Sequence, residues 1–335
     1  HTHRCRSMGA QASHDKAAGA GAERALGPER TAHARAVFQQ LAGGGGAVAT
    51  ATLQARAAAV LGGRDHDLAV RLAGEAAALG ETAWLALVAE LVQAPAEAKA
   101  ARYLPADGGG LPAALAAHAL AALVAAGGGG GGGEPGGTAA EPDEACRRVA
   151  EMFAHEASTG PAARVLRRYA LLERAFDYAV LCAVMGLDWT VVRTTPRLES
   201  LVPPCATEYS PLLLSPLERA LLHAFVPNEH RVTWSLLFSS ARDGASFAGL
   251  RKALGTRRST LLVLRDSHGH VFGGYALDPW EGHPSFYGSE ACFLFSLRPA
   301  TRIYTASGRT WNQDRKKEGK KERKEGRKKE SKKRL

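Results

Sequence analysis

Residues 261–280, LLVLRDSHGHVFGGYALDPW, have the pattern of two β-strands joined by a tight turn. Asp266 and Gly269 stand at the first and fourth turn positions, where these residue types are preferred. The apolar runs on either side supply the paired strands. We therefore predict a β-hairpin whose tip is Asp266–Gly269.

The same stretch could instead be a metal site, because it contains His268 and His270 beside Asp266. A metal needs three or four convergent ligands, and His283 and Cys292 stand at no recognised spacing. We therefore expect neither metal nor other cofactor here. Two adjacent glycines, at 273 and 274, predict a bulge or a close backbone approach within the second strand.

The surrounding sequence predicts an α+β module. Residues 231–240, 291–299 and 302–306 have strand patterns, and residues 246–254 form a short helix. Strand alternation places most of the large apolar residues on a common face. The predicted structural core is Trp234, Leu236, Phe238, Phe247, Leu262, Leu264, Phe272, Gly273, Gly274, Tyr275, Trp280, Phe293 and Phe295.

Residues 244–249, GASFAG, resemble a nucleophile elbow, but the spacing is G-x-S-x-x-G rather than G-x-S-x-G. Ser246 stands where a helix N-cap is expected. No aspartate–histidine pair follows it in a convincing order. We therefore predict no catalytic residues and no enzyme.

The chain of 335 residues is long enough for about two domains. Residues 1–30 are predicted to be disordered and residues 31–126 helical. Residues 38–53 have the outline of an EF-hand, with Gly46 at the tight turn and Val48 two residues later. Calcium requires several oxygen ligands, but the ligand positions hold Leu41, Gly43, Gly45 and Thr52, so no calcium is expected.

Residues 127–141 are glycine-rich and predict a flexible linker. A phosphate-binding loop is the alternative, but no Gly-Lys-Ser/Thr follows it. Residues 142–200 are predicted to be helical, with one long helix over 162–187. A further helix begins at Ser215, where Pro216 and Glu218 complete a capping box.

The net charge of +10 is concentrated in one segment. Residues 315–334 carry 13 Lys and Arg against 4 Glu, whereas the remaining chain is close to neutral. We predict that residues 309–335 form a disordered basic tail. Residues 315–334 would bind nucleic acid only non-specifically. A nuclear, nucleic-acid-associated protein acting through this tail is the alternative function.

Five cysteines without a C-x-x-C pair favour a reducing, intracellular compartment. The longest apolar runs are shorter than the roughly 20 residues that span a bilayer. If translation starts at Met8, the sequence MGAQAS fits the myristoylation pattern, with Gly9 as the acceptor. A lipid on Gly9 would bring the protein to a membrane surface.

Three blocks carry a resemblance to a known family: WSLLFSSARDGASFAGL at 234–250, the hairpin at 261–280, and SFYGSEACFLFSLRPATRIYTASG at 285–308. They resemble the TLDc domain in the same order. The preceding residues 201–227, LVPPCATEYSPLLLSPLERALLHAFVP, are most similar to the mTOR-associated TLDc subfamily. The resemblance covers residues 201–308, and the helical half is similar in layout only.

The resemblance implies a non-enzymatic interaction module of two packed antiparallel sheets flanked by helices. It implies resistance to oxidative stress, binding to the vacuolar proton-pumping ATPase and a link to mTOR signalling. The expected location is cytoplasmic and peripheral on lysosomal or vacuolar membranes. A complete TLDc domain continues with further strands after the position of Gly308. Without them we expect open sheet edges and exposed apolar faces.

Overall fold

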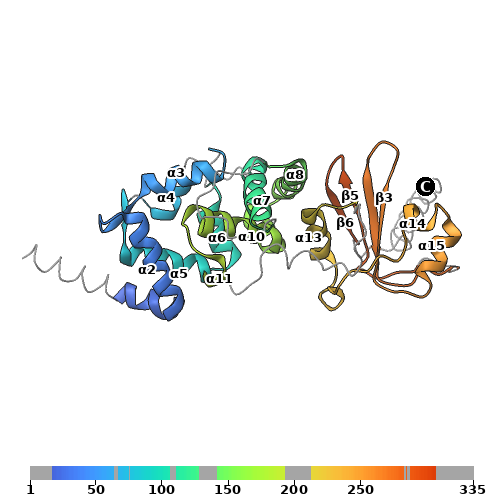
Figure 1. The fold of residues 1–335 in the computed structure, drawn as a ribbon, viewed down its shortest axis with the longest axis horizontal. Coiled ribbons are helices and arrows are strands. Elements are labelled where there is room, and N and C mark those ends of the chain that lie inside the picture. The colour runs from blue at the N-terminus through green and yellow to red at the C-terminus, as the bar shows by residue number, and fades with distance from the viewer. Residues whose placement is uncertain are drawn as a thin grey trace, which may run out of the picture. The chain divides into compact units, whose positions relative to one another are not determined.

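The computed structural model describes residues 17–63, 67–74, 76–105, 111–127, 142–192, 213–282, 284 and 287–306. The chain divides into two compact units, residues 1–236 and residues 237–335 (Figure 1). The first unit is built mainly of helices, and the second contains a four-stranded antiparallel sheet. The predicted α+β class is therefore confirmed.

The first half of the helical unit contains α2 (Pro28–Ala42), β1 (Ala47–Ala49), α3 (Thr50–Val60), α4 (Leu68–Ala73), β2 (Ala78–Gly80), α5 (Glu81–Gln93), α6 (Ala96–Tyr103) and α7 (Ala113–Gly127). The second half contains α8 (Glu144–Ala157), α9 (Ala162–Arg168), α10 (Ala170–Asp177), the π-helix η1 (Tyr178–Val184), α11 (Trp189–Val192), α13 (Pro216–Phe225) and the 3-10 helix η2 (Asn228–His230). None of the helices in the described ranges is both long enough and apolar enough to cross a bilayer.

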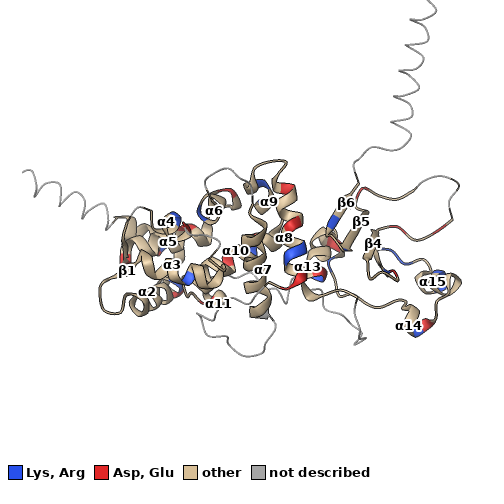
Figure 2. Cartoon of the chain, turned by 90° about the horizontal axis from the view of Figure 1, so that it is seen from above, with Lys and Arg blue, Asp and Glu red and all other residues tan. Residues whose placement is uncertain are grey.

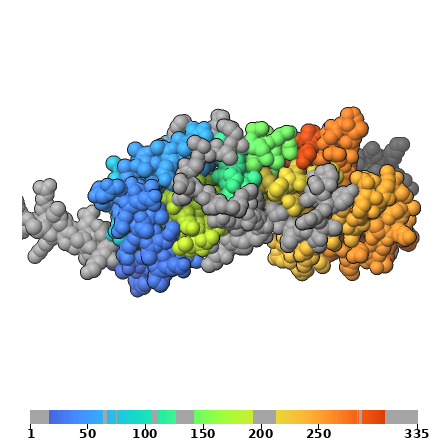
Figure 3. Space-filling model, viewed as in Figure 1, coloured from blue at the N-terminus to red at the C-terminus, as the bar shows by residue number. Residues whose placement is uncertain are grey.

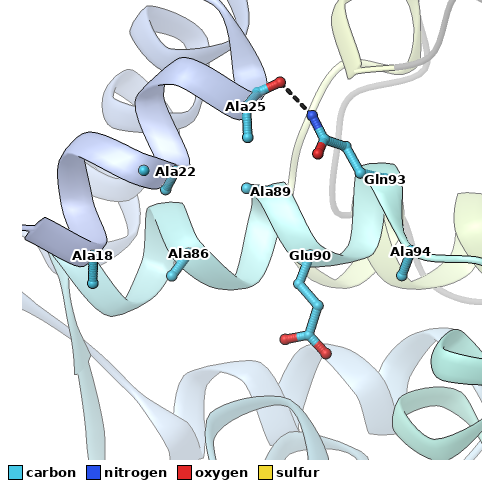
Figure 4. Close-up of a pocket in the computed structure, with 9 residues that line it drawn as sticks. Ala18, Ala22, Ala25, Ala86, Ala89, Glu90, Gln93 and Ala94 are labelled. Carbon is cyan, nitrogen blue, oxygen red and sulfur yellow. Dashed lines mark hydrogen bonds between the residues drawn. The ribbon is translucent and has the colours of Figure 1, made fainter.

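The prediction that residues 1–30 are disordered is wrong from residue 17 onward. Residues 17–26 form a helix, and its alanines favour that conformation because alanine has the highest intrinsic helix propensity. Ala22 and Leu26 are buried. The helix runs beside α5, where the Gln93 side chain donates a hydrogen bond to the Ala25 carbonyl (Figure 4). Helix propensity and burial against α5 together stabilise residues 17–26 as a helix, although this segment contains few large apolar side chains.

Two helix–loop–helix units stand next to each other at the start of the chain. The first is α2–β1–α3 and the second is α4–β2–α5. The short strands β1 and β2 pair antiparallel, with Val48 opposite Leu79. Gly46 takes the left-handed conformation, with φ of 70°, at the turn that the sequence assigned to it. The second unit was not predicted.

The single long helix predicted over 162–187 is divided in the structure. Tyr169 leaves the helical conformation between α9 and α10, and its hydroxyl donates to Glu156 Oε1. From Tyr178 the chain winds as a π-helix. Arg56 of α3 donates from Nη2 to the Ala183 carbonyl at 3.0 Å and from Nε to the Val184 carbonyl. These side-chain contacts come from distant segments, so helical periodicity alone could not predict the breaks.

The second unit contains α14 (Ser240–Asp243), α15 (Phe247–Leu254), β3 (Thr260–Arg265), β4 (Val271–Ala276), β5 (Phe293–Arg298) and β6 (Arg302–Thr305). The sheet order is β3-β4-β5-β6, and every neighbouring pair is antiparallel. The predicted hairpin is β3–β4. Within the described part of this unit there is this one sheet, whereas the family resemblance implied two.

The predicted strand over 231–240 is wrong. Only Trp234 makes an isolated bridge there, and α14 begins at Ser240. The boundary between the units also differs from the predicted start of the module at residue 201, because it falls after Leu236. Consequently α13, which lies within the resembling region, belongs to the helical unit. Gly9, residues 128–141 of the predicted linker and the tail at 309–335 lie outside the described residues.

Candidate interaction surface

One face of the C-terminal sheet is a buried aromatic core. In the register, Tyr275 stands opposite Phe293, and Gly273 stands opposite Phe295. All three aromatic side chains are buried, and the rings of Tyr275 and Phe293 stack with centroids 5.2 Å apart. Val271 and Leu297 are equally buried but were missing from the predicted core. The alternation that placed Phe293 and Phe295 on one face would also have placed Leu297 there.

The two adjacent glycines of β4 allow the neighbouring strands to approach closely. A Cβ atom on Gly273 would lie 1.9 Å from the Leu262 carbonyl oxygen. On Gly274 it would lie 2.9 Å from Leu294 Cδ2. The pairing of β4 with β5 also shifts register between Val271 and Phe272. The predicted close approach is therefore confirmed at the two glycines, and the irregular pairing lies just before them.

The opposite face of the sheet is apolar and open to solvent. Leu294 and Tyr304 are 64% and 57% exposed, and Leu264 and Phe272 are 43% and 40% exposed. The prediction that Leu264 and Phe272 lie in the core is wrong. Phe272 and Tyr275 are three residues apart on one strand, so they point to opposite faces. Leu264 is the cross-strand partner of Phe272 and shares its face.

Two further predicted core residues are also exposed. Phe247 is 73% exposed at the first position of α15, where an eight-residue helix leaves its first turn uncovered. Trp280 is 39% exposed, and its indole nitrogen donates to Thr260 Oγ1 at 2.8 Å. The remaining members of the predicted core are half-buried: Trp234, Leu236, Phe238 and Leu262.

The hairpin tip is held by the Asp266 carboxylate. Its Oδ1 accepts hydrogen bonds from the backbone nitrogens of His268 and His270, each at 2.9 Å. Its Oδ2 lies 2.8 Å from His270 Nδ1. Desolvation raises the pKa of Asp266, but the hydrogen bonds from His270 and His268 outweigh it, so the pKa is lowered below its ordinary value. The carboxylate therefore stabilises the turn in its ionised form.

The described residues include no group of three or more His, Cys, Asp or Glu side chains placed to hold a metal ion. At the elbow-like sequence, Ser246 caps α15, and its Oγ accepts from the Gly249 nitrogen at 3.2 Å. The N-cap prediction for Ser246 is confirmed. Its hydroxyl is thus engaged in holding a helix terminus.

Charged side chains in the helical unit also have structural partners. Lys99 is buried, and its Nζ lies 2.6 Å from Glu173 Oε1 and 3.0 Å from Asp177 Oδ2. Tyr103 donates to the other Asp177 oxygen at 2.6 Å. Acidic and basic side chains are interspersed along the helices of this unit (Figure 2).

The helical unit has a shallow groove of about 400 Å³ near its N-terminal end, which is coloured blue in Figure 3. It lies between residues 17–26 and α5, and small side chains line it, mainly Ala18, Ala22, Ala86 and Ala89 (Figure 4). Glu90 and Gln93 add the polar groups. A groove of small side chains on two packed helices has no feature that selects a ligand.

Comparisons with known proteins agree with the C-terminal architecture. The TLDc domain matches residues 207–313. MTOR-associated protein MEAK7 of Danio rerio is 36% identical over 129 residues, which are 37% of this chain and 28% of that protein. The Homo sapiens protein of the same name is 42% identical over 96 residues, or 29% of this chain and 21% of that protein.

A more distant relative is Oxidation resistance protein 1 of Xenopus tropicalis, which is 30% identical over 120 residues, or 36% of this chain and 14% of that protein. The matched region thus spans about a quarter of the length of the MEAK7 relatives. It contains α13 and the whole four-stranded sheet. Residues 207–313 therefore match the TLDc domain, and over this region the chain is similar to the MEAK7 and oxidation resistance proteins.

Proposed function

We propose that this protein is a non-enzymatic interaction protein that binds the vacuolar proton-pumping ATPase. The names of its relatives support a link to mTOR signalling and to resistance against oxidation. The ATPase as the direct partner follows from the family resemblance. The proposal places the protein in the cytoplasm, peripheral on lysosomal or vacuolar membranes.

One observation carries the non-enzymatic part of the proposal. Several polar side chains among the described residues of the TLDc blocks are engaged in holding the fold. Ser246 caps a helix, Asp266 and His270 hold a turn, and Trp280 bonds to Thr260. Nucleophilic catalysis needs a nucleophile and a base within hydrogen-bond reach of each other. These residues instead support a rigid scaffold for binding.

Membrane attachment through a lipid on Gly9 is a separate part of the proposal. A single myristoyl chain gives only marginal membrane binding, so the ATPase would provide the second contact. Expression from a start codon at Met8, followed by mass spectrometry of the N-terminal peptide, tests the acylation. Gly9→Ala is the control that must abolish it.

The ATPase interaction is tested by recovering its subunits from solubilised lysosomal membranes with the full chain. Gly273→Ala is the disrupting variant, because its Cβ atom would clash with the Leu262 carbonyl. Gly282→Ala is the matched control, since a Cβ atom there would meet nothing within 4 Å. We expect recovery with the control and loss with Gly273→Ala. Equal recovery with both variants would show that the sheet does not carry the interaction.

The basic tail is the basis of the alternative function, a nuclear or nucleic-acid-associated protein. A chain ending at Gly308 separates the two functions in the same recovery experiment. If the shortened chain still binds the ATPase at physiological and at raised salt, the result supports an interaction protein that does not depend on its tail. Electrostatic contacts made by the tail would weaken steeply as the salt concentration rises. Loss of a sequence-selective nucleic-acid interaction on deletion would favour the alternative.

A further inference from the structure

The C-terminal end of α15 carries a group of exposed cations. Residues 244–265 contain five Lys and Arg and no Asp or Glu. Arg251 and Lys252 lie in the last turn of the helix, and Arg257 and Arg258 follow it. These four residues are all exposed, and we call them the α15 patch. Charge that nearly cancels over the chain outside its tail is therefore of one sign here.

The backbone holds the cations together at this end of the helix. Ser246 caps the start of α15, and the buried Leu254 anchors its last turn. The Gly255 nitrogen donates to the Arg251 carbonyl at 3.0 Å. The Arg257 nitrogen donates to the Leu254 carbonyl, also at 3.0 Å. A turn closed by such a bond keeps its first and last residues within about 7 Å, so Arg257 stays beside the last helical turn.

Most of this charge is not neutralised within the described part of the chain. Arg258 pairs with Asp278 at 2.9 Å. Arg251, Lys252 and Arg257 form no ion pair with any residue that the structure describes. The helix dipole favours cations in the last turn, but Arg257 lies beyond the helix. Three cations are therefore available to an anionic partner.

An exposed aromatic ring adjoins the cations. Phe247 is 73% exposed and stands four residues before Arg251, so the two side chains share one face of the helix. Cations beside an apolar ring on a helix fit the boundary between lipid headgroups and acyl chains, where the ring leaves water and the cations meet phosphates. Single-stranded nucleic acid is bound by successive aromatic rings that stack on successive bases, whereas α15 offers one ring.

We propose that the α15 patch binds the surface of an anionic membrane, with its cations on the lipid phosphates and the Phe247 ring beneath them. This contact deepens the proposed function, because it rests on the peripheral membrane location. One myristoyl chain binds a membrane only marginally, and a polybasic patch is a second signal that makes the attachment stable. Each cation close to an anionic surface strengthens binding by about fivefold. The patch thus adds a lipid contact to the contact with the ATPase.

Co-sedimentation of the full chain with vesicles at physiological salt tests the proposal. Vesicles of equal parts phosphatidylcholine and phosphatidylserine should bind the chain, and phosphatidylcholine alone should not. Lys252→Gln combined with Arg257→Gln should weaken binding by about tenfold or more, since two cations are lost. Arg24→Gln combined with Arg164→Gln is the matched control, because it removes the same charge from exposed positions of the helical unit. It should bind like the unmodified chain.

The apolar contact is tested separately by Phe247→Ser, which should weaken vesicle binding by about fivefold without a change in charge. The basic tail also attracts anionic vesicles, but it is intact in every variant. Equal binding by the two double variants would therefore overturn the proposal and assign the vesicle contact to the tail.

A nucleic-acid role for the patch is the other outcome that overturns the proposal. It would appear as loss of RNA binding in the Lys252→Gln, Arg257→Gln variant while its vesicle binding stays unchanged. The vesicles contain no ATPase, and the ATPase recovery uses solubilised membranes without a bilayer. Failure of the lipid contact is therefore distinguishable from failure of the ATPase interaction.

Discussion

Glu218→Ala should destabilise the helical unit, because Glu218 holds two groups at once. Its side chain is 1% exposed, and Oε1 lies 3.2 Å from Arg148 Nη2. Its Oε2 accepts from the Ser215 nitrogen at 2.8 Å and completes the predicted capping box. Arg148 also pairs with Glu144, at 2.7 Å, but that carboxylate is 79% exposed.

The expected cost is about 3 kcal/mol. Removing one partner from a buried ion pair typically costs about 3–5 kcal/mol, because the other charge stays buried. The Glu144 carboxylate remains in the variant and partly compensates the charge of Arg148. We therefore expect a loss of stability at the lower end of that range. Glu144→Ala is the matched control on the same arginine. Because the Glu144 carboxylate itself is exposed, losing its i,i+4 pair with Arg148 should cost no more than about 0.5 kcal/mol.

Urea unfolding followed by far-ultraviolet circular dichroism measures both variants, because helices dominate that signal and lie mainly in the first unit. The two units can unfold separately, so the unfolding transition of the helical unit must be fitted separately from that of the second unit. A loss below 1 kcal/mol for Glu218→Ala would contradict the reasoning. Equal losses for the two glutamates would show that burial does not determine the strength of this network.

Three further predictions concern the core, a thiol and a loop. Phe293→Ala should cost about 3–5 kcal/mol in denaturant unfolding, because its ring is buried and stacked on Tyr275; a loss under 1 kcal/mol would mean that the site collapses freely. Burial first, and then Asp143, raises the pKa of the Cys146 thiol to about 12. The folded chain should therefore resist alkylation of Cys146 at pH 8, as measured by mass spectrometry. Because the unfolded thiol releases its proton first, this group's stabilising contribution should fall as pH rises from 9 toward 12. Calorimetry should detect no calcium binding tighter than the millimolar range in the loop from residue 41 to 52, which lacks carboxylates.

Local chemistry was predictable from the sequence where neighbouring residues are sufficient to determine it. The capping box at Ser215 and the N-cap at Ser246 were both predicted and are both present. The turn at Asp266–Gly269 also follows from its own residues, since Asp266 hydrogen-bonds the backbone two and four positions later. These features depend on hydrogen bonds that span only a few residues.

Features that depend on distant partners were not predictable in the same way. The break at Tyr169 and the π-helix near Arg56 involve contacts between separate helices. Residues 17–26 form an ordered helix because their buried side chains pack against α5. Propensity and periodicity describe one segment at a time, so they contain no information about such partners.

The sequence by itself determined that the C-terminal region forms strands and hairpins, because apolar alternation and turn residues are local signals. Only the tertiary structure decided which side of each strand is buried. Shifting a strand by one residue exchanges its two faces, so the choice depends on contacts beyond the strand itself. Alternation along β4 already places Phe272 and Tyr275 on opposite faces, but it does not say which of the two faces is covered. Packing against the rest of the unit puts Tyr275 in the core and leaves Phe272 at the surface.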